Sequence, residues 1–286
     1  MSPDQAEPQR LHKLVEAFAQ TTQAVVDLAR DCSDDDLAQP TECPGWTVHD
    51  QISHVAGVEA WLAGHKDPRV EVPPYEHIQN ELGKRVEYAV EVRRGRSGAE
   101  VVAELERVLA QRLSKLRGRL LTDTSIIAGP FGPDQAVAVM LMRIFDVWTH
   151  EQDIRSALGR PGNLDSPAAE VCVSAVMAQL PKLVARSAAL EPGHSLVIDV
   201  TGPTHARQGV QVGVDEQGRP RGHALSSDDS AQTPDQLLGP ATTISVSTEA
   251  FTRRAAGRRS VSDTAYRVIG DDAIALRVLE ALVVTH

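Results

Sequence analysis

Apolar residues recur at intervals of three and four over most of the first 190 residues. This spacing places them on one face of an α-helix. The segments that carry it are about 11–29, 48–63, 78–93, 98–120, 136–158 and 168–188. Clusters of proline and glycine such as Pro130–Pro133 and Gly159–Gly162 interrupt the pattern. We therefore predict a bundle of packed helices for this part of the chain.

The pattern changes at Glu191–Gly193. The segments that follow are rich in β-branched or alternating apolar residues, as strands are: 194–200, 210–215 and 242–247. Helical spacing returns over 248–256 and 271–284, and the polar stretch Ala224–Pro240 is expected to be a loop. We predict a mainly α N-terminal domain over residues 1–190 and a small α+β C-terminal domain over residues 191–286.

Charge and cysteine content exclude several classes of protein. The formal net charge is -10, which disfavours binding to nucleic acid or to anionic membranes. We expect no apolar run to reach the roughly 18 residues of a membrane span, and the polar, acidic N-terminus does not resemble a secretory signal. Three widely spaced cysteines form no disulfide framework. We predict a soluble, cytoplasmic protein without nucleic-acid or membrane partners.

The helix expected over 136–158 carries Asp146 and His150, which lie four residues apart and so share one face. Burying even a neutral polar group without a partner costs about 2–7 kcal/mol, so a carboxylate in this apolar stretch needs compensation. A metal ion provides it, and this spacing suits metal ligation. The alternative is an ordinary ion-paired stripe with Arg143 or Arg155 as partner.

His54 lies in the middle of the helix expected over 48–63, between Ile52 and Val55. Thr47 and Asp50 have the capping-box spacing that begins such a helix. A histidine in this position is more often a satisfied core or boundary residue than a metal ligand. From spacing alone, both interpretations stay open.

Two segments resemble the signatures of a known family. Residues 43–56 resemble the second helix of DinB-like bundles and, more closely, the mycothiol-dependent maleylpyruvate isomerase family. Residues 143–155 are similar to the family's second signature, and residues 241–258 with Gly270–Asp272 are similar to its sterol-carrier-like C-terminal domain. The resemblance covers nearly the whole chain. It implies a DinB-like four-helix bundle followed by the small α+β domain.

The resemblance also implies a metal site. Family members hold zinc, or another divalent metal, with two histidines and a carboxylate, and the matching positions are His54, Asp146 and His150. The family's carboxylate is often Glu, so Asp146 departs from it by one methylene. Three protein ligands leave one coordination position open, which is typical of a catalytic site. Asp153 is expected either to orient His150 or to be a solvent-facing charge paired with Arg155.

The implied function is that of a cytoplasmic enzyme with mycothiol as its thiol cosubstrate. A metal promotes the thiolate form of a bound thiol, which would allow S-transfer to a small electrophile or its thiol-assisted isomerisation. Arg143 is expected to contact an anionic cosubstrate. Arg258 is the match to the family's C-terminal active-site arginine, although its basic cluster could instead be a solvated face.

Two other classes of function stay open, because a fold does not fix an activity. One is a metal-dependent hydrolase that activates water, which would turn over without added thiol. The other is a non-catalytic protein that binds a small molecule, which has no need for an open metal site.

Overall fold

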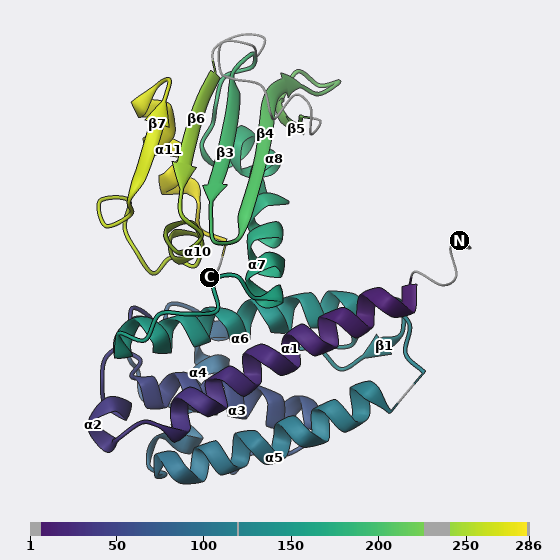
Figure 1. Ribbon diagram of the computed structural model, residues 1–286, viewed down its shortest axis with the longest axis vertical. Coiled ribbons are helices and arrows are strands. Elements are labelled where there is room, and N and C mark those ends of the chain that lie inside the picture. The colour runs from purple at the N-terminus through teal and green to yellow at the C-terminus, as the bar shows by residue number, and fades with distance from the viewer. Residues whose placement is uncertain (1–6, 119, 226–240, 285–286) are drawn as a thin grey trace. The chain divides into compact units, whose positions relative to one another are not determined.

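The computed structural model describes residues 7–118, 120–225 and 241–284. The described chain forms two compact units, Met1–Gly162 and Asn163–His286 (Figure 1). The first unit is mainly helical and the second combines helices with a five-stranded sheet. The predicted fold class, a helical N-terminal part followed by a small α+β part, is therefore confirmed.

Long helices build the first unit. Its elements are α1 (Glu7–Arg30), α2 (Asp34–Leu37), α3 (Val48–Ala63), α4 (Glu81–Arg94), α5 (Gly98–Arg117), β1 (Ile126–Ile127), β2 (Asp134–Gln135) and α6 (Ala136–Leu158). Helix α1 packs against α5 and α6, and α3 also packs against α5 and α6. These four helices form the bundle, and α4 covers α3. The predicted bounds of α3 and α6 are confirmed.

Local signals fix the ends of the two helices that carry the candidate ligands. The Thr47 side chain accepts a hydrogen bond from the Asp50 amide, and the Asp50 carboxylate accepts one from the Thr47 amide, which completes the capping box of α3. Gly64 (φ 96°) ends α3 and Gly159 (φ 62°) ends α6, both in the left-handed region that favours glycine. The candidate ligands therefore lie on well-defined helices.

The second unit begins with helices and continues as a sheet. Its helical elements are α7 (Pro167–Met177), α8 (Leu180–Lys182), the π-helical turn η2 (Leu183–Ser187), α10 (Thr248–Ala255) and α11 (Asp272–Ala281). Its strands are β3 (Ser195–Thr201), β4 (His205–Val214), β5 (Pro220–Ala224), β6 (Ala241–Val246) and β7 (Tyr266–Ile269). They lie in the order β5-β4-β3-β6-β7; β3 and β6 are parallel and the other neighbours antiparallel.

The compact units differ from the predicted domains over residues 163–190. The sequence groups α7, α8 and η2 with the bundle because their apolar spacing is helical. In the structure they pack against β4 and β5. The assignment of domains to 1–190 and 191–286 stays a prediction. Of the loop expected over Ala224–Pro240, residues 226–240 lie outside the described residues.

One helical stretch, Pro167–Ser187, is long and apolar enough to cross a membrane, with a mean hydropathy of 1.4 in its most apolar window. The expectation that no run reaches this length was therefore wrong. The core helix of a globular unit passes the same test, and 56% of the window is buried inside the structure. The stretch is weak support for a membrane span.

Candidate metal centre

Helices α3 and α6 bring His54, Asp146 and His150 together. Their potential ligand atoms all lie within 4.8 Å of one another. Nε2 of His54 lies 3.2 Å from Oδ2 of Asp146, and Nε2 of His150 lies 3.7 Å from Oδ1 of the same carboxylate. The two imidazole rings meet edge to face, with centroids 4.5 Å apart. The three residues named from the sequence thus form one cluster.

The cluster fits a divalent metal. Zinc binds imidazole nitrogen and carboxylate oxygen at about 2.0–2.2 Å, so tetrahedral ligand atoms lie about 3.4 Å apart. The 3.2 Å between Nε2 of His54 and Oδ2 of Asp146 is close to that spacing, and one ligand atom from each of the three residues lies within 4.8 Å of the others. Two imidazole nitrogens and one carboxylate oxygen also match the ligand preferences of zinc. The shorter Asp146 side chain therefore reaches both imidazoles.

The outer nitrogen of His150 is held by two acceptors. Nδ1 lies 2.5 Å from Oε1 of Gln51 and 3.3 Å from Oδ2 of Asp153, which is fully buried. Because both partners accept, we assign the proton to Nδ1, which leaves Nε2 free as a metal ligand. Arg155 pairs instead with Glu151, at 2.8 Å. The geometry agrees with the expectation that Asp153 orients His150.

Nδ1 of His54, the ring nitrogen that faces away from Asp146, has different surroundings from Nδ1 of His150. It is buried without a hydrogen-bond partner among the described residues. Burial lowers the pKa of His54 and so favours the neutral imidazole that a metal requires. Nε2 faces Asp146 in both histidines. The Nδ1 atoms differ, because Nδ1 of His150 has two acceptors and Nδ1 of His54 has none among the described residues.

Opposing effects set the charges of the other two candidate ligands. Burial would raise the pKa of Asp146, but Arg143 and His54 outweigh it and hold that pKa well below its usual range. Burial would lower the pKa of His150, but its interactions with Asp146 and Asp153 outweigh it and raise the pKa. Asp146 is therefore an anion at neutral pH, as a ligand must be.

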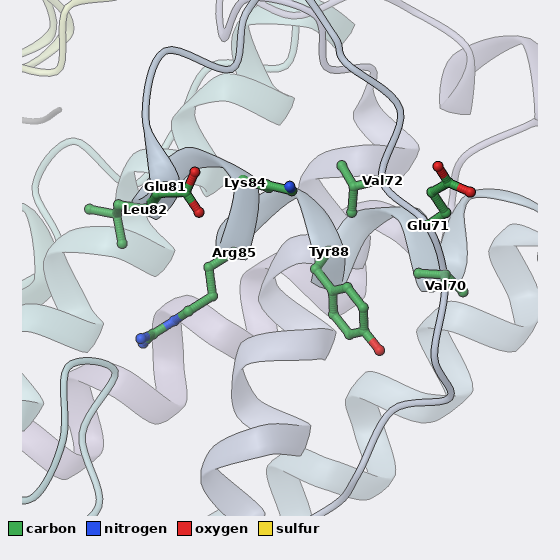
Figure 2. Close-up of a pocket in the computed structure, with 8 residues that line it drawn as sticks. All are labelled: Val70, Glu71, Val72, Glu81, Leu82, Lys84, Arg85 and Tyr88. Carbon is green, nitrogen blue, oxygen red and sulfur yellow. The ribbon is translucent and has the colours of Figure 1, made fainter.

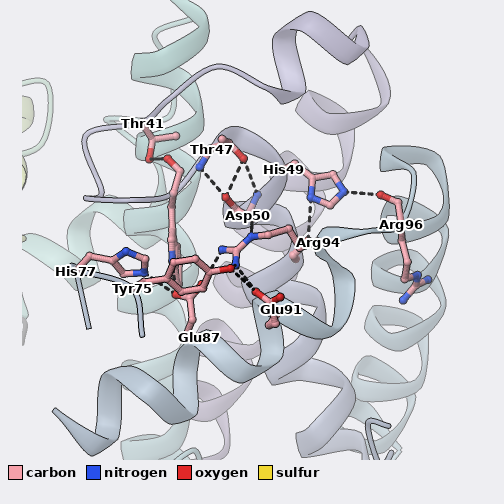
Figure 3. Close-up of polar contacts among 12 residues, drawn as sticks. Thr41, Thr47, His49, Asp50, Tyr75, His77, Glu87, Glu91, Arg94 and Arg96 are labelled. Atoms are coloured by element: carbon pink, nitrogen blue, oxygen red, sulfur yellow. Dashed lines mark hydrogen bonds and ion pairs between the residues drawn. The ribbon is translucent and has the colours of Figure 1, made fainter. Parts of the chain in front are cut away.

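Trp46 forms an aromatic wall beside the cluster. Its ring centroid lies 5.2 Å from that of His54 and 5.7 Å from that of His150. Its indole Nε1 donates a 2.8 Å hydrogen bond to Oε2 of Glu87. Glu87 also accepts from Arg94 within the polar network of Figure 3. The sequence singled out Trp46 only as part of a signature.

A surface pocket of about 800 Å³ lies elsewhere in the first unit, beside α4. Figure 2 shows Lys84, Arg85 and Tyr88 of α4 on one side of it and the segment Val70–Val72 on the other. Its lining contains none of the candidate metal ligands and carries charges of both signs. We assign no role to this pocket.

The two arginines expected to contact substrate have different surroundings. Arg143 is 2% exposed and donates to Oδ2 of Asp146 from Nη1 (2.8 Å) and to Oε1 of Glu59 from Nε (2.7 Å). Arg258 belongs to the second unit, where Nη1 donates to the carbonyl of Ala256 at 3.0 Å. The structure thus places Arg143 against a candidate ligand. The role of Arg258 stays a prediction.

Fold and cluster together define a class: a helical bundle with a potential metal site on facing helices, followed by an α+β unit. Residues 18–155 match the model of the mycothiol maleylpyruvate isomerase N-terminal domain. These residues form a domain of that family, and they contain all three candidate ligands. The family resemblance read from the sequence is confirmed.

Solved structures show a similar fold. The chain resembles the crystal structure of a histidine-to-alanine mutant of the mycothiol-dependent maleylpyruvate isomerase, with 16% identity and a TM-score of 0.54 over 90% of this chain and 92% of that chain. It also matches a second crystal structure of that enzyme, with 17% identity and a TM-score of 0.49 over 88% and 90% of the chains. At such identity the first likeness shows the fold. No curated protein matches the sequence.

Proposed function

We propose that this protein is a zinc-dependent enzyme that uses mycothiol in a reaction of a small electrophile, either S-transfer or thiol-assisted isomerisation. One observation carries the proposal: two imidazoles and a carboxylate converge within a domain of the mycothiol maleylpyruvate isomerase family. The relatives of known structure are described as mycothiol-dependent isomerases, which favours a thiol as cosubstrate.

The residues of the cluster would have separate roles in the proposed reaction. His54, Asp146 and His150 would hold the metal, which would supply the positive charge that favours a thiolate near neutral pH. The carboxylate of Asp146 accepts a hydrogen bond from Arg143 and would bind the metal, so we do not assign it the role of base for the thiol proton. Its side chain is 31% exposed, against 4% for His54 and 9% for His150, so the cluster is most accessible beside Asp146.

Trp46 would exclude water from one side of the cluster, since its ring packs against both imidazoles. Cys32, Cys43 and Cys172 are free cysteines, which fits the proposed cytoplasmic location. The sulfur in the proposed reaction comes from the cosubstrate, so none of the three is required for catalysis.

The metal assignment is tested by elemental analysis of purified variants. His54→Ala and His150→Ala should each reduce the metal content from about one ion per chain to near zero, because two ligands bind far more weakly than three. His65→Ala is the matched control, since His65 is exposed and hydrogen-bonds Gln111 instead. Metal content near one ion per chain in both ligand variants would show that the site lies elsewhere.

The thiol assignment is tested by calorimetry with mycothiol. The metal-loaded protein should bind mycothiol at least about tenfold more tightly than the metal-free protein, a difference of roughly 1.4 kcal/mol. Equal affinity would contradict the proposal. Turnover without any thiol would favour the hydrolase, and ligand binding without turnover would favour the non-catalytic binding protein.

A further inference from the structure

A line of charged side chains extends from Asp146 through the buried Arg143 and Glu59 to Arg112. Arg143 donates to Asp146 and also to Glu59, as described above. The second oxygen of Glu59, Oε2, accepts a 2.9 Å hydrogen bond from Nε of Arg112. Glu59 is fully buried, and Arg143 and Arg112 are 2% and 4% exposed. The line crosses the bundle from α6 through α3 to α5.

The charges in this line balance, since two arginines face two carboxylates. An unpaired buried charge is strongly destabilising, so each member depends on its neighbours. Glu59 is shared, with one oxygen for each guanidinium. Nη2 of Arg143 and Nη2 of Arg112 are buried without hydrogen-bond partners among the described residues. The position of Arg143 therefore depends mainly on Glu59 and Asp146.

This arrangement restricts the carboxylate of Asp146. Arg143 holds Oδ2 of Asp146 with a single nitrogen, Nη1. The same oxygen lies 3.2 Å from Nε2 of His54, and Oδ1 faces Nε2 of His150. A guanidinium free of other partners tends to bind both oxygens of a carboxylate through two parallel hydrogen bonds. Here Glu59 occupies Nε, and Arg143 contacts Asp146 through Nη1 alone. Glu59 thus fixes the guanidinium that orients the carboxylate of Asp146.

We propose that Glu59 and Arg143 are positioning residues of the metal centre: Glu59 anchors Arg143, which holds the carboxylate of Asp146 in place against the imidazoles of His54 and His150. The inference rests on the proposed metal site. Hydrogen-bond partners of metal ligands typically contribute about 10–100-fold to metal affinity or activity. Arg143 is then a support of the site and not a substrate contact.

The test compares Glu59→Gln with Glu104→Gln. Glu104 is a matched control because it is also buried in the first unit and also lies between two arginines, Arg93 at 2.7 Å and Arg96. Each variant removes the negative charge of a carboxylate that lies between two arginines. Urea unfolding measures the loss of stability in each, so that a general loss of stability is separated from an effect on the metal.

The readouts are zinc affinity, from competition with a chelating dye, and the visible absorption spectrum of the cobalt(II)-loaded protein. Glu59→Gln should weaken zinc binding by about 10–100-fold and shift the cobalt bands, because the coordination of Asp146 changes. Glu104→Gln should leave both unchanged. Wild-type affinity and bands in Glu59→Gln, or equal losses in both variants, would overturn the inference.

A second variant covers the case in which Glu59→Gln does not fold. Arg143→Lys keeps the positive charge but cannot bridge Glu59 and Asp146 with a rigid fork. It should weaken zinc binding by about tenfold and shift the cobalt bands; wild-type behaviour would overturn the inference. Failure of the proposed site has a separate signature: the wild type binds no metal, or His54→Ala binds it normally.

Discussion

Trp46 links the cluster to the polar network beside it, and its two contacts can be separated by mutation. Trp46→Phe keeps an aromatic ring beside His54 and His150 but removes the indole donor to Glu87. The free energy of unfolding should fall by about 1–3 kcal/mol, because a buried hydrogen bond to a carboxylate is lost. Metal content should stay near one ion per chain, since no ligand is changed.

Urea denaturation checks this expectation. Trp61→Phe is the control, because Trp61 is 47% exposed and its substitution should change the free energy of unfolding by at most about 0.5 kcal/mol. Equal destabilisation by the two substitutions would mean that the hydrogen bond to Glu87 contributes nothing measurable.

Residues of the site were predictable from the sequence where the signal is local. Asp146 and His150 lie one turn apart on a single helix, so their spacing alone raised the metal hypothesis. Gln51 and Glu59 were missed because their partners are 99 and 84 residues away. The sequence did not reveal that Arg143 is buried, because its burial results from the packing of α3 against α6.

At the scale of elements, α3 and α6 were predicted with their bounds. A capping box and a glycine mark the two ends of α3, and Gly159 marks the C-terminal end of α6. The N-terminus of α6 has no side-chain cap. Strands β5 and β7 were missed. Both are edge strands, and β5 has the sequence PRGHA, which lacks alternating apolar residues. Their pairing comes from the neighbouring strand, so no local pattern predicts it.

Helix α4 is tied to the segment before α3 by Glu87, which is 1% exposed. Burial would raise the pKa of Glu87, but hydrogen bonds from His77, Trp46 and Arg94 outweigh it and lower the pKa below its ordinary 4.5. A carboxyl whose pKa is lowered by folding stabilises the folded state above its unfolded pKa. That contribution is lost as the pH falls through the folded pKa.

The prediction compares wild type with Glu87→Gln in the presence of a chelator. Wild type should be the more stable at about pH 6, and the difference should shrink as the pH falls below about 4.5. Glu87 is then protonated first in the unfolded chain and, below its lowered pKa, also in the folded protein. Urea unfolding over this pH range measures it. A difference that stays constant with pH would show that the ionised form of Glu87 contributes nothing.

At the scale of the whole molecule, the change from helical to alternating spacing predicted the two-part architecture, because the period of the apolar pattern is visible in the sequence. The compact units divide after Gly162, whereas the predicted domains divide after residue 190. The segment from α7 to η2 is helical whichever unit it packs against, and only its contacts with β4 and β5 place it in the second unit.

The division between units leads to a prediction for Arg258. All three candidate ligands lie in the first unit and Arg258 lies in the second. Arg258→Gln should therefore leave the metal content near one ion per chain while it lowers thiol-dependent turnover by about tenfold or more, as expected if a charged contact with an anionic substrate is lost. Unchanged turnover would show that Arg258 has no catalytic role.

The central claim is that the cluster of His54, Asp146 and His150 holds a metal that accepts a thiol. X-ray absorption at the zinc edge of the loaded protein, recorded with and without mycothiol, tests it most directly. We predict only nitrogen and oxygen ligands at about 2.0–2.2 Å without the thiol, and one added sulfur at about 2.3 Å with it. A zinc spectrum that mycothiol leaves unchanged at saturation would contradict the account.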